Sequence, residues 1–224
     1  MAGGRYLPGM KRLAIFDLDG TLLDSFPWFL RVVNSVAQRH GFRSVDAHDI
    51  EMLRGRDSRQ ILDFLGVPKW KLPFIGRDMR RIKSEAMADI ALFDGVDAML
   101  AALGTGGIVL AVVSSDSENN ARAALGNCAR HISYFECGAS LFGKAANYKR
   151  VLLRAGVPAD QAIAIGDEVR DGEAARKAGI AFGAVSWGFA SIEALQKLDP
   201  DFVFARIDEI PWKLSRVGKP AASD

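Results

Sequence analysis

Short apolar runs alternate with amphipathic stretches along most of this chain. The apolar runs occupy residues 13–16, 108–113, 162–165, 180–185 and 202–204. The amphipathic stretches occupy residues 117–125, 147–155, 169–178 and 192–197, and the first three end at Gly126, Gly156 and Gly179. Continuous apolar runs suit parallel strands that are buried on both faces, and glycine commonly follows the last turn of a helix. The alternation therefore predicts an α/β fold with a doubly wound, mainly parallel sheet.

One long region interrupts this alternation. Its pattern is helical over residues 28–39, 46–53, 58–65 and 73–88, with no convincing strand. A helical segment of this length after the first strand predicts an inserted α-helical cap domain. The predicted division is a core of residues 11–24 and 92–215, a cap of residues 25–91, and flexible tails at 1–10 and 216–224.

Composition limits the classes of function without selecting one. The 224 residues are 49% hydrophobic and 25% charged, which is typical of a soluble globular protein. A net charge of only +2 argues against nucleic acid or an anionic membrane as a partner. No apolar run reaches the roughly 18 residues of a membrane span, and the first ten residues do not resemble a secretory signal. Cys128 and Cys137 make no disulfide or metal framework, so we expect a cytoplasmic protein.

Two acidic segments follow predicted strands. Asp17 and Asp19 come directly after the first strand, and Gly20 allows a sharp turn behind them. Carboxylates this close repel each other unless a cation lies between them, and Mg²⁺ prefers carboxylate oxygens. Asp167 and Asp171 follow the strand at 162–165 in the same way. Because parallel strands end at one edge of the sheet, the two segments are expected to meet there.

Two further segments carry groups suited to a phosphate. Ser114, with Ser115 beside it, ends the strand at 108–113, where a hydroxyl and nearby backbone N–H groups could hold a phosphate. Lys144 lies in a loop before a predicted helix, and its ammonium could offset the charge of an aspartate and a phosphate. Each feature alone also fits a structural role, as a turn, an acidic helix start, a helix cap or a surface lysine.

The order and spacing of these segments resemble the haloacid dehalogenase-like hydrolase superfamily over most of the chain, from about residue 12 to 214. The residues that carry the resemblance are Phe-Asp-Leu-Asp-Gly-Thr-Leu-Leu-Asp-Ser at 16–25 and Ile-Gly-Asp-Glu-Val-Arg-Asp at 165–171. The helical insert resembles the C1-type cap of the phosphoglycolate phosphatase-like branch, and so does Trp-Gly-Phe at 187–189. The resemblance implies a Rossmann-like core and a phosphatase of the HAD type.

The resemblance also implies roles for individual residues. Asp17 would be the nucleophile that forms an aspartyl phosphate, and Asp19 the general acid and base. Mg²⁺ would be held by Asp17, the Asp19 carbonyl and Asp167, with support from Asp171. The transferring phosphoryl group would be bound by Ser114, Ser115 and Lys144. Lys144 is followed by two alanines where many relatives have a proline-containing stretch, so Lys149 stays the alternative lysine.

The insert is basic, which bears on the substrate. Between Arg54 and Lys83, nine basic residues stand against three acidic ones. A basic cap over a phosphate site favours a substrate with further negative charge, although a solvated basic helix face would have the same composition. Gly55 and Arg56 lie in a loop between two predicted helices and are the predicted substrate contacts in the cap.

The predicted function is a Mg²⁺-dependent phosphatase of a small organic phosphate monoester, with phosphoglycolate as one candidate. A phosphosugar mutase of the β-phosphoglucomutase type keeps both aspartates and the same cap type and remains an alternative, as does a pyrophosphatase. A phosphonatase would need a lysine of the cap at the site, and the sequence marks none. A receiver-type signalling domain would also phosphorylate an aspartate, but it has no helical insert. The expected assembly is a monomer or a homodimer.

Overall fold

A computed structural model describes residues 10–138 and 143–216 of the chain. The strands are β1 (Leu13–Phe16), β2 (Val109–Val113), β3 (Tyr134–Glu136), β4 (Ala162–Gly166), β5 (Ala181–Val185) and β6 (Phe202–Phe204). The helices are α1 (Phe26–His40), α2 (Asp49–Arg54), α3 (Ser58–Leu65), α4 (Leu72–Glu85), α5 (Val96–Thr105), α6 (Glu118–Leu125), α7 (Lys144–Ala155), α8 (Val169–Ala178), α9 (Ile192–Gln196) and α10 (Glu209–Arg216). The predicted tails at 1–10 and 216–224 fall almost wholly outside the described residues.

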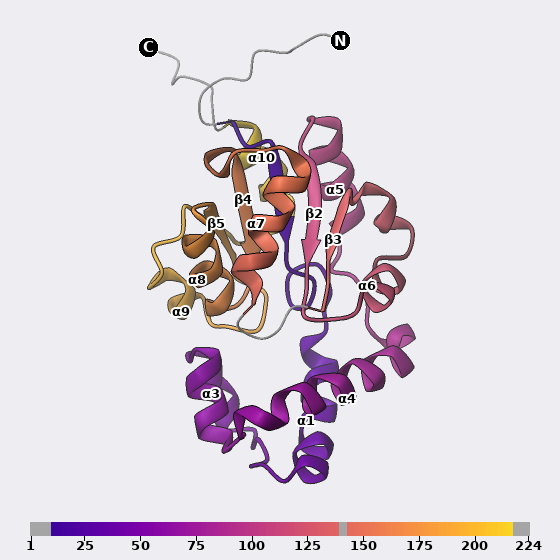
Figure 1. The fold of residues 1–224 in the computed structure, drawn as a ribbon, viewed down its shortest axis with the longest axis vertical. Coiled ribbons are helices and arrows are strands. Elements are labelled where there is room, and N and C mark those ends of the chain that lie inside the picture. The colour runs from indigo at the N-terminus through magenta and orange to yellow at the C-terminus, as the bar shows by residue number, and fades with distance from the viewer. Residues whose placement is uncertain (1–9, 139–142, 217–224) are drawn as a thin grey trace.

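The strands form one six-stranded sheet in the order β3-β2-β1-β4-β5-β6, and every pairing is parallel. Figure 1 shows the sheet with helices on both of its sides. The order reverses direction at β1, which lies between β2 and β4. In open parallel sheets the carboxyl ends of the strands beside such a switch point form the usual ligand site. The doubly wound parallel sheet is confirmed.

Two hydrophobic clusters cover the two faces of the sheet, because successive side chains of a strand point to opposite faces. Ala14 and Phe16 of β1 pack on one face with buried residues of α5 and α10. Leu13 and Ile15 pack on the other face with buried residues of α7, α8 and α9. All four residues of β1 are fully buried, which explains why this strand reads as a continuous apolar run.

Three elements of the core, β3, α5 and α10, lie outside the predicted strands and helices. The edge strand β3 has only three residues, and only Phe135 among them is buried, so no apolar run marks it. Helix α5 carries apolar residues around much of its circumference and therefore lacks a clear amphipathic pattern. β3 and α5 pack against β2, and α10 packs against α5, so the positions of all three depend on tertiary contacts.

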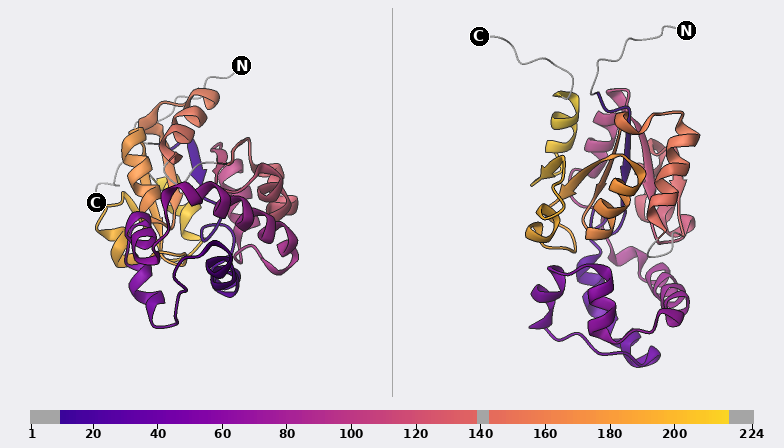
Figure 2. Two further views of the ribbon diagram at one scale, coloured as in Figure 1. Left: turned by 60° about the horizontal axis from the view of Figure 1, so that its bottom comes forward. Right: turned by 60° about the vertical axis from the view of Figure 1, so that its left-hand side comes forward.

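The insert between β1 and β2 is helical, as predicted. Helices α1 to α4 gather below the carboxyl edge of the sheet in Figure 1, and Figure 2 shows the same separation from a second side. The two connections lie side by side: the Asp24 N–H donates to the Ala91 carbonyl at 2.9 Å, and the Phe93 N–H donates to the Leu22 carbonyl at 3.0 Å. Because the two connections to the insert are hydrogen-bonded side by side, they support our proposal that residues 25–91 form a separate cap domain.

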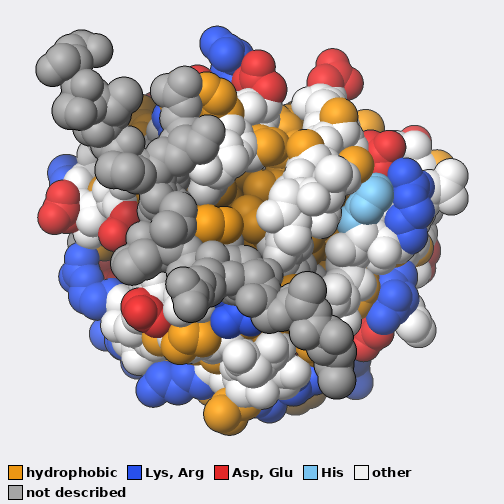
Figure 3. Space-filling view, turned by 90° about the horizontal axis from the view of Figure 1, so that it is seen from above, with side chains coloured by type: hydrophobic (Ala, Val, Ile, Leu, Met, Phe, Trp, Pro, Cys, Tyr) orange, Lys and Arg blue, Asp and Glu red, His pale blue; other side chains and the backbone are white. Residues whose placement is uncertain are grey.

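The surface at the end of the molecule away from the cap carries charges of both signs. In Figure 3, which looks onto that end, basic and acidic side chains both occur around the rim, with apolar side chains between them. None of the helices in the described part of the chain combines the length and the apolar character of a membrane span.

Candidate active site

Asp17 lies directly after β1 and is almost fully buried, with 2% of its surface exposed. Its backbone N–H continues the ladder to β4 by donating to the Ile165 carbonyl at 2.9 Å. Oδ1 accepts the Leu18 N–H at 2.8 Å, and Oδ2 lies 2.7 Å from the Lys144 ammonium. The carboxylate is thus held in one orientation at the edge of the sheet.

Asp167 takes the matching position after β4. Its Oδ1 accepts the Thr21 hydroxyl at 2.7 Å, and its Oδ2 accepts the Phe189 N–H at 2.8 Å. Gly20 has a φ of 75°, and a Cβ there would lie 2.2 Å from Asp167 Oδ2. Glycine is therefore needed at position 20 both for the left-handed backbone and for the close approach of the carboxylate.

Asp171 and Lys144 complete the buried cluster. Asp171 lies in the first turn of α8, where its Oδ2 accepts the Glu168 N–H at 3.0 Å and its Oδ1 accepts the Lys144 ammonium. Lys144, the first residue of α7, is only 3% exposed and bridges Asp17 and Asp171. Lys149 is exposed on the same helix. The geometry therefore places Lys144, and not Lys149, beside the predicted nucleophile.

Burial and mutual repulsion set the electrostatics of this cluster. Burial, together with the charge of Asp17, raises the pKa of Asp167 well above its usual value. Burial also raises the pKa of Asp171 to about 6, although Lys144 acts in the opposite direction. For Lys144, burial alone would lower the pKa, but the charges of Asp17 and Asp171 outweigh it and raise the pKa. Lys144 is thus held as a cation among carboxylates that carry an excess of negative charge.

The residues present fit a hard divalent cation. Carboxylate oxygens of Asp17, Asp167 and Asp171 lie within 4.8 Å of one another, and all three side chains are buried. Lys144 and Arg170 do not balance these three carboxylates together with that of Glu168, and an oxygen-only set of donors is the set that Mg²⁺ prefers. The cluster therefore provides a predicted metal site at the position that the sequence indicates, with Asp17 and Asp167 as side-chain ligands and Asp171 in support.

The loop after β2 brings Ser114 to the same edge of the sheet. Ser114 is 1% exposed, and its hydroxyl oxygen accepts the Asp116 N–H at 3.0 Å, which folds the loop back on itself. The Ser115 carbonyl accepts Nη1 of Arg80 from the cap at 3.3 Å. Ser114 thus follows β2 at the edge of the sheet where β1 and β4 also end, while Ser115 links the loop to the cap. Their roles in phosphate binding stay predictions.

Sequence reasoning missed Lys83 and Asp116. Lys83 belongs to cap helix α4, yet only 4% of its surface is exposed, because its ammonium donates to both oxygens of Asp19 at 2.6 and 2.8 Å. It also forms an ion pair with Asp116 Oδ2 at 2.8 Å. Burial lowers the pKa of Lys83, but the charges of Asp19 and Asp116 outweigh that effect and raise it. The sequence marks no lysine of the cap for this site, whereas the structure brings Lys83 to it.

The predicted cap contacts Gly55 and Arg56 lie next to a residue that contacts the core. The Arg56 guanidinium lies 5.1 Å from the centre of the Phe64 ring within the cap. Arg54, at the end of α2, donates from Nε to the Phe189 carbonyl at 3.1 Å and from Nη2 to the Gly188 carbonyl at 3.2 Å. These carbonyls follow β5, so Arg54 fastens the cap beside Asp167. A role of Gly55 and Arg56 in substrate binding stays a prediction.

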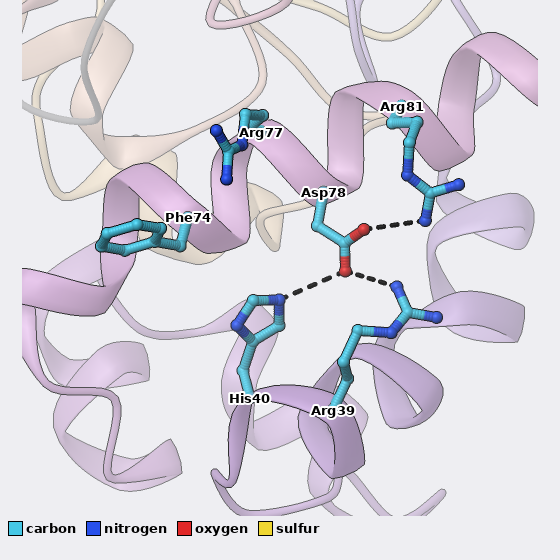
Figure 4. Close-up of a pocket in the computed structure, with 6 residues that line it drawn as sticks. All are labelled: Arg39, His40, Phe74, Arg77, Asp78 and Arg81. Carbon is cyan, nitrogen blue, oxygen red and sulfur yellow. Dashed lines mark hydrogen bonds and ion pairs between the residues drawn. The ribbon is translucent and has the colours of Figure 1, made fainter.

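A second group of charges lies within the cap, around a cavity of about 410 Å³ between α1 and α4. Figure 4 shows Arg39 and His40 of α1 and Arg81 of α4 directed at Asp78, with Arg77 and Phe74 on the adjoining turn. Hydrogen bonds from Arg39 and Arg81 lower the pKa of Asp78 to about 2. This group cross-braces two cap helices and is separate from the carboxylates at the edge of the sheet.

Comparisons with known proteins agree with this geometry. The family model described as haloacid dehalogenase-like hydrolase matches residues 14–185. A phosphoglycolate phosphatase from Synechococcus elongatus is 31% identical over 191 residues, which cover 84% of this chain and 90% of that protein. Among solved structures, a haloacid dehalogenase-like family protein from Streptococcus pneumoniae superposes with a TM-score of 0.74 at 22% identity, over 91% of this chain and 98% of its own. A Lactobacillus plantarum protein does so with a TM-score of 0.78 at 19% identity, over 92% of this chain and 99% of its own.

The likeness to the two solved structures shows the fold, while the match to the family model and the likeness to the curated relative show descent. They agree with the resemblance seen in the motifs around Asp17 and Asp167. The chain therefore belongs to the haloacid dehalogenase-like hydrolase family, as a phosphatase of its phosphoglycolate phosphatase-like branch.

Proposed function

We propose that this protein is a Mg²⁺-dependent phosphatase that hydrolyses a small organic phosphate monoester through a phospho-aspartyl intermediate on Asp17. The observation that carries the proposal is the meeting of Asp17, Lys144, Asp167 and Asp171 at the carboxyl edge of β1 and β4. Phosphoglycolate is a candidate substrate, because the curated relative from Synechococcus elongatus carries that name. We expect the enzyme to act in the cytoplasm as a monomer or a homodimer.

The proposed reaction has two half-reactions. A carboxylate oxygen of Asp17 attacks phosphorus, the bond from phosphorus to the ester oxygen breaks, and Asp19 donates a proton to the leaving alcohol. Water then attacks the phosphorus of the aspartyl phosphate while Asp19 takes up its proton, and the bond to Asp17 breaks to release phosphate. Lys144 stays paired with Asp17 and Asp171, next to the transferring group, and would offset its negative charge.

The metal would be held by Asp17, the Asp19 carbonyl and Asp167, with Asp171 in support. When bound, Mg²⁺ would neutralise the phosphate oxygens and lower the repulsion between the substrate and the nucleophile. Asp167 is oriented for this by Thr21 and Phe189.

Lys83 does not favour phosphonatase chemistry, although it reaches the site. A Schiff base needs a neutral amine, whereas the pKa of Lys83 is raised by two carboxylates that keep the amine charged. A phosphosugar mutase remains the second candidate, because Asp19 would serve both activities. The two differ in product: the mutase returns the phosphoryl group to a sugar and releases little free phosphate.

The test is phosphate release from a panel of esters that includes phosphoglycolate, sugar phosphates and pyrophosphate, with Mg²⁺ and with excess chelator. We expect catalytic turnover that requires Mg²⁺ and that is lost in Asp17→Asn. The matched control is Asp160→Asn, an exposed carboxylate at the opposite end of the sheet, just before β4 begins. A folded wild-type protein that releases phosphate from none of these esters, or an active Asp17→Asn variant, would contradict the proposal.

A further inference from the structure

Lys83 brings a charge from the cap into direct contact with the proposed acid and base. Its ammonium lies 2.6 and 2.8 Å from the two oxygens of Asp19, and the side chain has lost almost all contact with solvent. An ammonium has three N–H donors; here the ammonium donates to both Asp19 oxygens and forms an ion pair with Asp116 Oδ2. Desolvating a buried cation costs free energy even when it is paired, so the position of Lys83 suggests a functional role.

Asp116 keeps Lys83 in place independently of Asp19. Asp116 is 3% exposed, and its Oδ1 accepts the Ser117 N–H at 2.7 Å and Asn120 Nδ2 at 2.8 Å. Its Oδ2 faces the Lys83 ammonium at 2.8 Å. If Asp19 turned away from Lys83, the pair between Lys83 and Asp116 would remain, because a lone buried carboxylate is unfavourable.

The backbone of α4 is fastened at the same point. The second hydrogen of Asn120 Nδ2 reaches the Arg80 carbonyl at 3.0 Å, so one amide joins α4 to the loop that holds Asp116. Arg80 itself donates to the carbonyl of Ser115. The position of Lys83 is therefore fixed through its helix as well as through its counter-ion.

We propose that Lys83 is a specificity-determining residue that binds the leaving group of the ester and favours leaving groups with a carboxylate next to the ester oxygen. This inference rests on the proposed phosphatase function. Asp19 must touch the ester oxygen to protonate it, so the leaving group lies within reach of an ammonium that is hydrogen-bonded to Asp19. When an Asp19 oxygen turns to the ester, one donor of Lys83 becomes available to the substrate.

The charges around the site make Lys83 the group that an anionic leaving group would need. The carboxylates of Asp17, Asp19, Asp116, Asp167 and Asp171 lie there with the ammonium groups of Lys83 and Lys144, and Glu168 and Arg170 lie beside the buried cluster. Lys144 is engaged by the carboxylates on the side of the nucleophile, whereas Lys83 lies on the side of the leaving group. A carboxylate on that side would be repelled by Asp19 and Asp116 unless Lys83 paired with it. Because Lys83 contacts Asp19 directly, this carboxylate must be close to the ester oxygen, which selects short substrates.

The test compares two esters of similar size, 2-phosphoglycolate and ethyl phosphate, whose leaving groups differ in the carboxylate. We expect Lys83→Met to lower kcat/KM for 2-phosphoglycolate about 10- to 100-fold more than for ethyl phosphate, mainly through KM. Lys83→Arg should restore part of the difference. Lys69→Met, which removes an exposed cap lysine, is the matched control and should lower both values equally and slightly.

A second measurement separates binding from folding. Titration calorimetry of 2-phosphoglycolate with Asp17→Asn, and with Asp17→Asn plus Lys83→Met, should show affinity lost on removal of Lys83. If Lys83→Met does not fold, the double variant Lys83→Met with Asp116→Asn removes both buried charges and should show the same larger loss of kcat/KM on 2-phosphoglycolate than on ethyl phosphate.

Equal losses on the two esters would overturn the inference, since Lys83 would then act only through Asp19 or the fold. A wild-type enzyme that prefers ethyl phosphate would also overturn it while leaving the phosphatase function intact. Failure of the proposed function has a different signature, because the wild type would then release phosphate from neither ester nor from any other member of the panel.

Discussion

The molecule contains two clusters of charged side chains that respond to their surroundings in opposite ways. In the core, Asp167 and Asp171 are fully buried, and burial raises the pKa of both groups. In the cap, Asp78 is partly exposed and lies among Arg39, Arg81 and His40, whose hydrogen bonds lower its pKa to about 2. The same residue type is destabilised as an anion in the first cluster and stabilised in the second.

This difference favours a structural role for the cap cluster and a functional role for the core cluster. The cap cluster contains more cations than anions and joins α1 to α4, which is a structural task. The core cluster is buried away from solvent and contains more anions than cations. A fold gains no stability from such an arrangement on its own. An excess of buried carboxylate is instead what a metal and a phosphoryl group would use.

The largest expected effect comes from the cation of the core cluster. Lys144→Met should lower the free energy of unfolding by about 3–5 kcal/mol, because Asp17 and Asp171 lose their buried partner. It should also lower phosphate release by at least about 100-fold, since the transferring group loses its counter-charge. Urea denaturation and steady-state kinetics give the two values.

Lys149 supplies the matched control on the same helix. Lys149→Met changes an exposed lysine and should alter stability by less than about 0.5 kcal/mol, with activity preserved. If Lys149→Met were the more damaging variant, the assignment of Lys144 would be wrong and the core cluster would not need its cation.

The next effect concerns the excess of negative charge. Without metal, Asp167→Asn should raise the free energy of unfolding by on the order of 1–2 kcal/mol, because one buried like charge is removed. The melting temperature should rise with it. The amide can still accept from the Phe189 N–H and donate to the Thr21 hydroxyl. The same variant should lose the stabilisation that Mg²⁺ gives the wild type, about 2.7 kcal/mol at a concentration 100 times the dissociation constant.

The sign of the pH dependence follows from the raised pKa values. Folded Asp167 and Asp171 hold protons at pH values where the unfolded chain has released them, so their contribution to stability falls as pH rises. For Asp171, whose pKa is raised to about 6, the fall runs from about pH 4 to about pH 6. Stabilisation by Mg²⁺ should grow over the same range, because the metal binds deprotonated carboxylates. Melting curves with and without Mg²⁺ measure both trends. A metal-free Asp167→Asn variant less stable than the wild type would show that the core cluster is a brace like the one in the cap.

Much of the core cluster could be predicted from the sequence, for a local reason. Asp17 and Asp167 each follow a short apolar strand, and parallel strands bring their carboxyl ends to one edge. Lys83 could not be predicted in this way, since it contacts Asp19 across 64 positions of sequence and depends on how α4 docks on the loop after β2. The role of Asp116 could not be predicted either, because an acidic residue between two serines is typical of an ordinary helix start.

The cap shows the same limit of local reasoning. Its basic composition is plain in the sequence, but composition does not tell which arginine faces the core. Arg54 and Arg56 are two positions apart, yet Arg54 bonds to the loop after β5 while Arg56 lies over a ring of its own domain. The direction of each side chain is set by the turn of α2 and by the cap's packing on the core, which single residues do not encode.

The smallest expected effect belongs to the cap cluster, and the pH dependence of stability identifies this effect. At neutral pH, Asp78→Asn should lower stability by no more than about 1 kcal/mol, since solvent screens partly exposed pairs. The pKa of Asp78 is lowered from its ordinary value to about 2, so its carboxylate stabilises the folded state above about pH 4 and this contribution fades as pH falls toward about 2. The difference in melting temperature between wild type and Asp78→Asn should therefore shrink over that interval, and added salt should reduce it at any pH. Asp63→Asn, an exposed acid on α3, is the control and should show no such trend. Because phosphate release should be unchanged in Asp78→Asn, a loss of activity equal to that of Lys144→Met would mean that the cap cluster, too, belongs to the site.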